Sequence, residues 1–534
     1  MELSRAIVTR NPEVRLLDSV ASLVELSQIL NFIRRRTIYF NNLSATVGEE
    51  EFDALDEHTE RGRWEHFYLL PPSCRLSPEK HGHLLSRNWT GARGLFCTDS
   101  VRWQISDYVE FLKRNYLVPP NFVIYSPKSL GLNNDRDLFA LLSATDSDFI
   151  RRTGLTLDRL SFYYTPLPLS LARELTALND KIAFRQWLGE HLPRHCPTTY
   201  FGRHFPELME AVKEIFSDFD AVVIQLQNSA GGIGTIILVK QDKNNYAVIK
   251  GDRKFTVAGL DEAIHEVLRD KPSETLLIIS PFYGTIEKDL DLNVESGSVG
   301  YLFIPGKAPK VLRTHARKQI INPKDLSYIG FDYQADETQE LTETLDLLGL
   351  RLLEFARPSL AKYDREEVAK IIPASIDFFI KPHMSYQSDP ASLVTPCEAN
   401  VRDSAVQSAI YLILLTLGKT NQLHNPIYNP FLKGSEYSFC QCDQVKIDMD
   451  PRRNGRIDYE MICEHLRERI AEAYSVPAKD VRLFNRRNFA TAAQNGEMPI
   501  LFLPMTAYNP HGSIAVLLFY PKLLGAEKFF AAFC

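Results

Sequence analysis

A glycine-rich stretch, Asn228-Ser-Ala-Gly-Gly-Ile-Gly-Thr235, constrains the fold of this chain more than any other segment. The apolar run Ala221–Leu226 precedes it and the β-branched run Thr235–Lys240 follows it, so both flanks favour strands. Glycines let a backbone approach a ligand closely and let successive N–H groups converge on an anion. The stretch therefore predicts a loop that joins two strands and covers phosphates, although a simple hairpin turn explains the glycines equally well.

Two common phosphate-binding loops do not fit this segment. A P-loop needs a lysine after its last glycine, and Thr235 follows Gly234 directly. A Rossmann turn opens a helix, whereas the residues after Gly234 have a strand pattern. Two strands joined by a glycine loop also cover phosphates in protein kinases, but the H-R-D and D-F-G motifs of kinases are absent.

Acidic and amide side chains form the second signal, in the segment Pro396-Cys-Glu-Ala-Asn-Val-Arg402. Side chains alternate along a strand, so Glu398, Asn400 and Arg402 share one face. Upstream, Asp377 stands in the otherwise apolar run 374–380, where an unpaired carboxylate would be costly. Carboxylate and amide oxygens are hard ligands that suit Mg²⁺, and arginine can grip a carboxylate or a phosphate. A solvated strand edge with a local Glu398–Arg402 ion pair is the alternative.

The order of these segments resembles the ATP-grasp superfamily of carboxylate–amine ligases over about 175–420. The Glu-x-Asn-x-Arg ending is closest to the branch of peptide and amide ligases in natural-product biosynthesis. The matching segments are Asn179-Asp-Lys181, the strand 222–226, the loop 229–235, a hinge at 279–283, Arg317-Lys-Gln319, the strand 375–378 and Glu398–Arg402.

The resemblance implies a role for each matching residue. Nucleotide binding would fall to Lys181, Gln225, Ser229, Gly231, Gly232, Gly234, Thr235, Ile279, Ser280, Pro281, Phe282 and Gln319. Asp377, Glu398 and Asn400 would hold Mg²⁺, and Arg402 would be catalytic, facing the transferred phosphate or the substrate carboxylate. Gln225 stands where many members have a second lysine, and Lys250 or Lys318 could compensate for it.

The resemblance also implies an α/β (α+β) chain with an ATP-grasp fold. We expect an N-terminal α/β domain at 1–170, subdomain A with the glycine hairpin at 171–270, subdomain B with the metal site at 271–420, and a C-terminal lid or extension at 421–534. Periodicity predicts helices at 20–34, 101–115, 169–188, 205–216, 259–269, 337–354, 403–417 and 459–474. It predicts strands at 121–125, 221–226, 235–240, 246–250, 275–280, 371–380, 395–402, 499–504 and 513–520.

Composition narrows the setting. The net charge of −6 does not indicate a polyanion-binding protein, so we expect no nucleic-acid partner. The longest apolar run, Ala409–Leu415, is far shorter than the roughly 20 residues of a membrane span. Eight cysteines without framework spacing suggest thiols and a reduced, cytoplasmic, soluble protein. The resemblance also implies that two copies of the chain form a homodimer.

The predicted reaction is ATP-dependent ligation. A small-molecule carboxylate, such as an amino acid, would be activated as an acyl phosphate and coupled to an amine, releasing ADP and phosphate. The cofactors implied are ATP and Mg²⁺. Two alternatives stay open, which are a non-catalytic ATP-binding scaffold and an ATP-dependent phosphotransferase or carrier-acylating enzyme.

Overall fold

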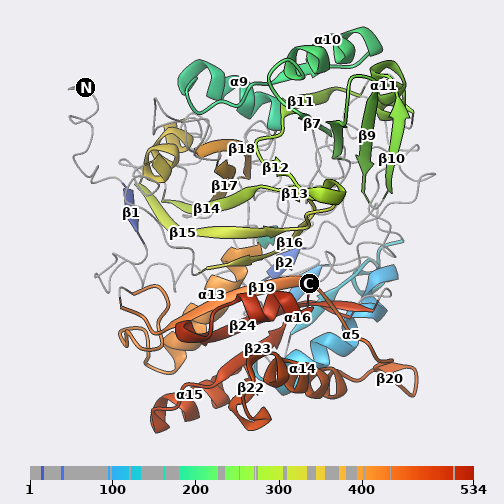
Figure 1. Cartoon of the computed structure of the whole chain (residues 1–534). Coiled ribbons are helices and arrows are strands. Elements are labelled where there is room, and N and C mark those ends of the chain that lie inside the picture. The colour runs from blue at the N-terminus through green and yellow to red at the C-terminus, as the bar shows by residue number, and fades with distance from the viewer. Residues whose placement is uncertain are drawn as a thin grey trace.

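The structure is a computed structural model of the 534-residue chain. It describes residues 14–16, 38–40, 94–96, 99–118, 122–133, 160–162, 180–226, 235–251, 253–269, 271, 275–304, 310–333, 344–354, 372–380, 394–400, 405–432, 434–508 and 512–533. Helices and sheets are mixed along the whole described chain, as the α/β prediction requires (Figure 1).

A six-stranded sheet forms the upper part of the molecule in Figure 1. Its order is β10 (Arg253–Ala258), β9 (Asn245–Lys250), β8 (Ile236–Lys240), β7 (Ala221–Leu226), β11 (Leu277–Pro281) and β6 (Tyr200–Gly202), with every pair antiparallel. One face packs on α10 (Phe205–Ile215) and α11 (Leu260–Leu268) through residues such as Val222, Ile224 and Leu238. The other face carries a smaller apolar cluster that includes Ile237, Ile249 and Phe282.

A ten-stranded sheet crosses the middle and lower parts of the molecule. Its order is β18 (Val394–Asn400), β17 (Ile372–Ile380), β14 (Glu295–Ile304), β15 (Lys310–Ile321), β16 (Tyr328–Asp332), β19 (Tyr437–Lys446), β24 (Ser513–Pro521), β23 (Ile500–Pro504) and β22 (Val481–Leu483), and β1 (Val14–Leu16) pairs with β15. Only the β1–β15 and β22–β23 pairs of this sheet are parallel. Short ladders join β12 (Thr285–Ile286) to β13 (Leu292–Asn293) and β20 (Arg452–Arg453) to β21 (Arg456–Ile457).

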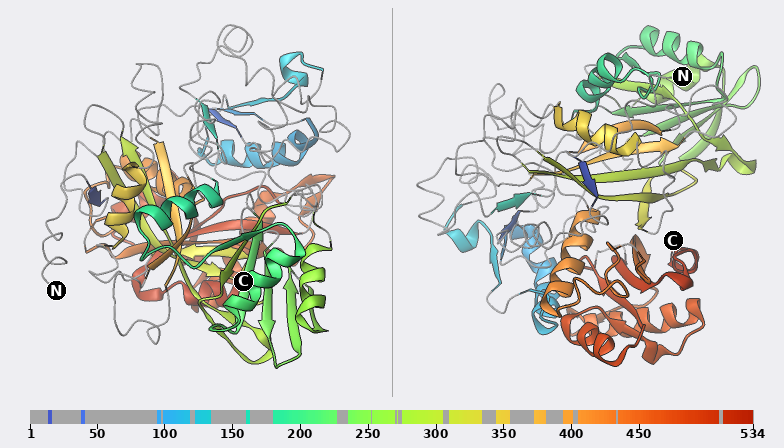
Figure 2. Two further views of the ribbon diagram at one scale, coloured as in Figure 1. Left: turned by 90° about the horizontal axis from the view of Figure 1, so that it is seen from above. Right: turned by 90° about the vertical axis from the view of Figure 1, so that its left-hand side faces the viewer.

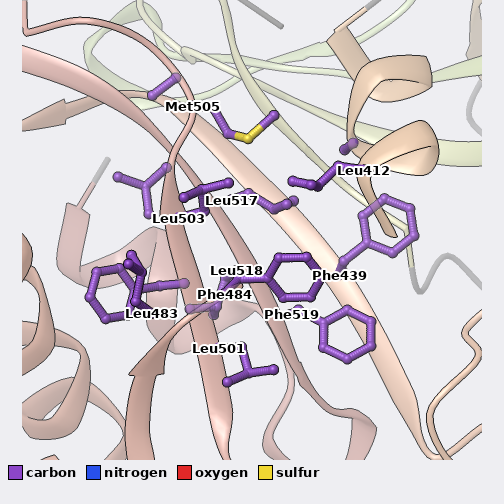
Figure 3. Packing of buried hydrophobic residues seen from close by; sticks show 14 of the residues in the cluster. Leu412, Phe439, Leu483, Phe484, Leu501, Leu503, Met505, Leu517, Leu518 and Phe519 are labelled. Carbon is purple, nitrogen blue, oxygen red and sulfur yellow. The ribbon is translucent and has the colours of Figure 1, made fainter. Parts of the chain in front are cut away.

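The C-terminal strands extend this sheet, because β16 pairs with β19. Their core contains Phe439, Leu501, Leu503, Leu517 and Phe519, which Figure 3 shows packed together. It is covered by α13 (Ala405–Lys419), α14 (Tyr459–Tyr474), α15 (Arg486–Asn495) and α16 (Glu527–Phe533). Residues 421–534 thus continue the sheet of 271–420.

The N-terminal region contributes a four-stranded parallel sheet, ordered β4 (Val123–Tyr125), β3 (Gly94–Phe96), β2 (Ile38–Phe40) and β5 (Leu160–Phe162). The helix α5 (Asp99–Arg114) attaches this region to the C-terminal core (Figure 2). Phe111 of α5 stacks on Tyr459 of α14 at a ring distance of 5.2 Å, and Tyr108 packs on the same ring in a tilted arrangement at 5.3 Å. The junction is therefore apolar and aromatic.

Most predicted elements that fall on described residues are confirmed within one to three residues at their ends. The predicted helix at 169–188 is wrong at Asp180, because this residue is extended and its side chain caps a helix that starts afresh, α9 (Lys181–His191). Residues 20–34 lie outside the described part. Cys442 is disulfide-bonded, which corrects the expectation of free thiols at that position. None of the described helices has the length and apolar character that crossing a bilayer demands.

Candidate functional site

One face of the large sheet near its β18 edge is polar. The register places Asp377 opposite both Glu398 and Ser298, and places Ser375 opposite Asn400. Neighbours in register project to the same side of a sheet, so side chains separated widely in sequence meet here. The other face holds Val299, Tyr301, Ala374, Ile376 and Ala399. A helix at 344–354 and the apolar side of α9 cover it, so alternation along each strand separates a core face from the site face.

Each carboxylate oxygen of the pair is held by an N–H donor. Asn400 donates its Nδ2 to Asp377 Oδ2 and to Glu398 Oε1, at 3.3 Å in both cases. Gln319 donates its Nε2 to Asp377 Oδ1 at 3.0 Å, and Ser296 donates its hydroxyl to Gln319 Oε1 at 2.6 Å. The fourth oxygen, Glu398 Oε2, pairs with Lys181 Nζ at 2.8 Å. The carboxylates are thus oriented before any ligand arrives.

Two cations on α9 approach this pair from the sheet edge. Lys181 and Arg185 stand one helical turn apart and are only 7% and 4% exposed. Arg185 donates its Nε to the carbonyl of Cys397 at 2.8 Å and its Nη1 to Thr199 Oγ1 at 3.0 Å. The β17–β18 register shifts between Asp377 and Phe378, so the Cys397 carbonyl lies at a bulge. Arg185 therefore fixes the backbone immediately before Glu398 and ties it to the chain entering β6.

Among the described residues of this cluster, Lys181 and Arg185 supply two positive charges beside the two carboxylates of Asp377 and Glu398. The thiol of Cys397 lies among them, and burial raises its pKa well above the ordinary range, with a further contribution from the neighbouring carboxylates. Its Sγ donates to the carbonyl of Asp377 at 3.1 Å. Cys397 is thus a structural thiol and not a nucleophile.

The second half of the candidate site comes from the six-stranded sheet, here called the small sheet. Its inner face is the face that does not pack on α10 and α11. The Ile224–Ile236 pairing makes Gln225 and Thr235 neighbours on the face opposite the α10–α11 core. Thr235 is 7% exposed, and its hydroxyl finds no hydrogen-bond partner within the described chain. The hydroxyl of Ser298, opposite Asp377, is likewise buried and unpartnered. Buried hydroxyls are normally satisfied, so both are consistent with a ligand that completes them.

The hinge strand β11 has one backbone edge that becomes free at its end. Residues Leu277–Ile279 pair with β6 on one side and with β7 on the other, whereas Ser280 and Pro281 pair with β7 alone. The side chain of Ile279 is buried against the α10–α11 core, and Phe282 packs on the inner face. The backbone groups of Ser280 and Pro281 on that edge can therefore contact a ligand, whereas the backbone of Ile279 is paired on both sides.

Sequence-predicted residues fall into three groups. Lys181, Gln319, Asp377, Glu398 and Asn400 meet in one network. Gln225, Thr235, Ile279, Ser280, Pro281 and Phe282 lie on or beside the small sheet. Arg402, Ser229, Gly231, Gly232 and Gly234 lie outside the described residues, as does the loop that they were predicted to form.

Lys250 and Lys318 were expected to compensate for the missing lysine at position 225. Neither side chain lies on the face of its sheet that carries the candidate site. Lys250 pairs with Ile236, whose side chain joins the α10–α11 core. Lys318 is exposed and adjacent to Gln319, so strand alternation directs it away from Asp377. Sequence reasoning also missed Arg185, Thr199 and Ser296. Arg185 could have been noticed, because it follows Lys181 by one turn of the same helix.

Comparison with known proteins gives distant similarities. No family model matches the chain, and no curated protein matches it. Among solved structures, N5-carboxyaminoimidazole synthetase from Staphylococcus aureus complexed with ADP aligns over 93% of this chain and 97% of its own, at 8% identity and a TM-score of 0.42. The biotin carboxylase domain of a Hydrogenobacter thermophilus 2-oxoglutarate carboxylase, with MgADP and bicarbonate, covers 97% and 88%, at 9% identity and a TM-score of 0.37.

A third solved structure, D-cycloserine synthetase DcsG, covers 60% of this chain and 97% of its own, at 11% identity and a TM-score of 0.33. At these values the likeness describes shape only, so the function is derived from the residues of the site.

Proposed function

We propose that this chain is an ATP-grasp ligase that activates a small carboxylate as an acyl phosphate and joins it to an amine, forming an amide and releasing ADP and phosphate. The observation that carries the proposal is the network around Asp377 and Glu398, with Asn400, Gln319 and Lys181 donating to their oxygens. The motifs that resemble ATP-grasp enzymes in the sequence supply the residues of this network. The predicted substrate partners are one small acid and one amine.

The donor chemistry fits Mg²⁺. Two carboxylates and an amide oxygen are hard ligands, and a carboxylate oxygen that accepts one N–H bond still has a free lone pair. Opposite Asp377, the buried hydroxyl of Ser298 has no hydrogen-bond partner among the described residues. Asp377, Glu398 and Asn400 would hold the ion, which neutralises charge on the transferred phosphoryl group. Asn400 would take part through its amide oxygen.

The protein's own groups then perform the positioning. An oxygen of the substrate carboxylate attacks the γ-phosphorus, and the bond to the ADP oxygen breaks. Lys181, which pairs with Glu398 Oε2, would place its ammonium beside the phosphates. The amine nitrogen attacks the acyl carbon, loses a proton to solvent, and phosphate leaves. Placing the reactants in line supplies much of the acceleration.

Water must be excluded while the acyl phosphate exists, because this mixed anhydride hydrolyses readily. Thr235 directly follows the glycine loop, and its unpartnered hydroxyl lies on the inner face of the small sheet. We assign the covering role to residues 228–235 and phosphate neutralisation or substrate-carboxylate binding to Arg402. A homodimer is the state expected from the resemblance, and sedimentation tests it.

A second candidate is a nucleotide-binding scaffold without turnover. One observation favours it: Gln225 carries no charge, and no lysine replaces it among the two candidates. Lys250 and Lys318 both lie on the face of their sheet that points away from the candidate site. A scaffold would bind MgATP and release no ADP with any acid and amine. A phosphotransferase would release ADP with a single acceptor and no amine.

The test is ADP release from MgATP in the presence of pooled amino acids, small carboxylates and amines. Glu398→Gln keeps the shape of the side chain and removes its charge, so we expect ADP release to fall to background. Glu354→Gln is the matched control, because Glu354 is half exposed and pairs with Arg351 on the surface. Full activity in the Glu398 variant would remove this network from the reaction.

A further inference from the structure

A polar pocket is formed by residues that come before and after the network just described in the sequence. It has a volume of about 430 Å³ and is lined by Arg114, Asn115, Tyr116, Arg482, Asn485, Arg487, Asn488 and Thr491. This volume falls within the range of small-molecule sites, which is roughly 300–1,000 Å³. Among the described residues that line it, three are arginines and none is an aspartate or glutamate. This lining favours an anionic ligand.

Two of the three guanidiniums are held in place by carboxylates outside the pocket. Arg114 pairs with Glu460 at 3.3 Å, and Arg482 pairs with Glu497 at 2.6 Å. Each pairing uses one Nη atom and leaves further N–H donors, since a guanidinium has five. Arg487 is exposed, and its guanidinium forms no ion pair or hydrogen bond with the residues that the structure describes. Two anchored cations and one unengaged cation thus surround the same space, with a net positive charge.

The neutral lining groups are also fixed in place. Asn115 and Asn488 donate their Nδ2 atoms to the carbonyls of Phe111 and Leu483, at 3.0 and 2.8 Å. The ring of Tyr116 stands at the rim of the pocket and is 76% exposed. The backbone of Tyr116 has a φ of 58°, which non-glycine residues rarely adopt. An exposed aromatic ring beside cations suits a ligand that carries both a ring and an anion.

The pocket joins two parts of the chain that are distant in sequence. Arg114, Asn115 and Tyr116 come from the end of α5, and the other lining residues come from β22 and the start of α15. The same junction is held by the Arg114–Glu460 pair and by the bond from Ile457 N to Asp107 Oδ2, at 2.9 Å. A bound ligand would therefore bridge the N-terminal region and the C-terminal core.

We infer that this pocket binds a small phosphate-bearing molecule, such as a sugar phosphate, through Arg114, Arg482 and Arg487. Planar guanidinium groups match phosphate oxygens and can bind them in pairs. The inference goes beyond the proposed ligase, because the described residues that line the pocket include none to which a nucleotide or metal role was assigned. The site adds a ligand contact between α5 and α15, and occupancy holds these two segments together.

Isothermal titration with ribose 5-phosphate, and with ribose as the uncharged counterpart, tests the inference. We expect a single binding event for ribose 5-phosphate, none for ribose, and weakening as salt is raised. Arg487→Ala should weaken binding by about tenfold or more, and Arg487→Lys by less, because a charge remains but the fork is lost. Arg486→Ala is the matched control, since this exposed neighbour does not line the pocket and should bind as the wild type does.

Variants of the two sites separate this inference from the proposed function. Glu398→Gln abolishes ADP release and should leave ribose 5-phosphate binding unchanged. Hydrogen exchange in 107–116 and 482–491 should slow on binding in the wild type and not in Arg487→Ala. The inference is overturned if ribose 5-phosphate does not bind, if Arg487→Ala binds it with wild-type affinity, or if binding is lost in Glu398→Gln.

Discussion

The Lys181–Glu398 ion pair has an energetic signature that a double-mutant cycle can measure. The two atoms are 2.8 Å apart, and the side chains are 9% and 18% exposed. At that separation a unit pair attracts by about 6 kcal/mol at an effective dielectric constant of about 20, and by about 1.5 kcal/mol in bulk water. Removing one partner of a buried pair costs about 3–5 kcal/mol, because the other charge stays desolvated. The partial exposure of Glu398 places Lys181→Met near the lower value, about 3 kcal/mol.

Glu398→Gln leaves the ammonium of Lys181 buried, so we expect a similar loss of about 3 kcal/mol. The double variant buries no unpaired charge, and it should cost about 3–4 kcal/mol instead of the sum, a coupling of about 2–3 kcal/mol. Hydrogen exchange in α9 and β18 measures this locally, and a loss of 3 kcal/mol corresponds to about 100-fold faster exchange.

The exposed pair Lys113–Glu110 is the matched control for this cycle, because its atoms are 3.0 Å apart while Glu110 is 64% exposed. Lys113→Met should change stability by less than about 1 kcal/mol. Strictly additive losses at Lys181 and Glu398 would refute the reasoning, since they would mean that neither charge depends on the other.

Three further predictions concern neighbouring residues. Arg185→Lys keeps the charge, but a lysine cannot reach both the Cys397 carbonyl and Thr199. We therefore expect kcat to fall more than tenfold with little change in the KM for ATP. A pH–rate profile of unchanged shape checks that no titrating group was lost. Gln225→Lys should tighten MgATP binding several-fold in a titration, and unchanged affinity would show that Gln225 does not face the phosphates. Burial raises the pKa of Cys397, so a maleimide at pH 8 should leave this thiol unlabelled in the native protein and label it after unfolding.

Sequence reasoning located the elements well because apolar runs mark the buried strands and helical periodicity marks the helices. The runs at 221–226 and 459–474 match β7 and α14 residue for residue. The expected helix at 169–188 was wrong at Asp180, because this side chain caps the first turn of α9 and the backbone there is extended. The link between β16 and β19 could not be predicted, since strand pairing across 100 residues leaves no local pattern.

The candidate site was predicted in part for the same reason. Asp377, Glu398 and Asn400 share a face by strand alternation, and the register then brings them together. The contact of Lys181 with Glu398 depends on how α9 meets the sheet edge, which no spacing encodes. Arg185 escaped notice because it binds a backbone carbonyl at a bulge, and a bulge is a property of two paired strands.

The central claim is that a carboxylate is activated by phosphorylation at this network. The most direct measurement labels the carboxylate oxygens of the accepted acid with ¹⁸O and follows the label during turnover with MgATP and the amine. The account predicts one labelled oxygen in the released phosphate, with ADP as the other product, and no transfer in Glu398→Gln. Unlabelled phosphate, or the appearance of AMP and pyrophosphate, would contradict it.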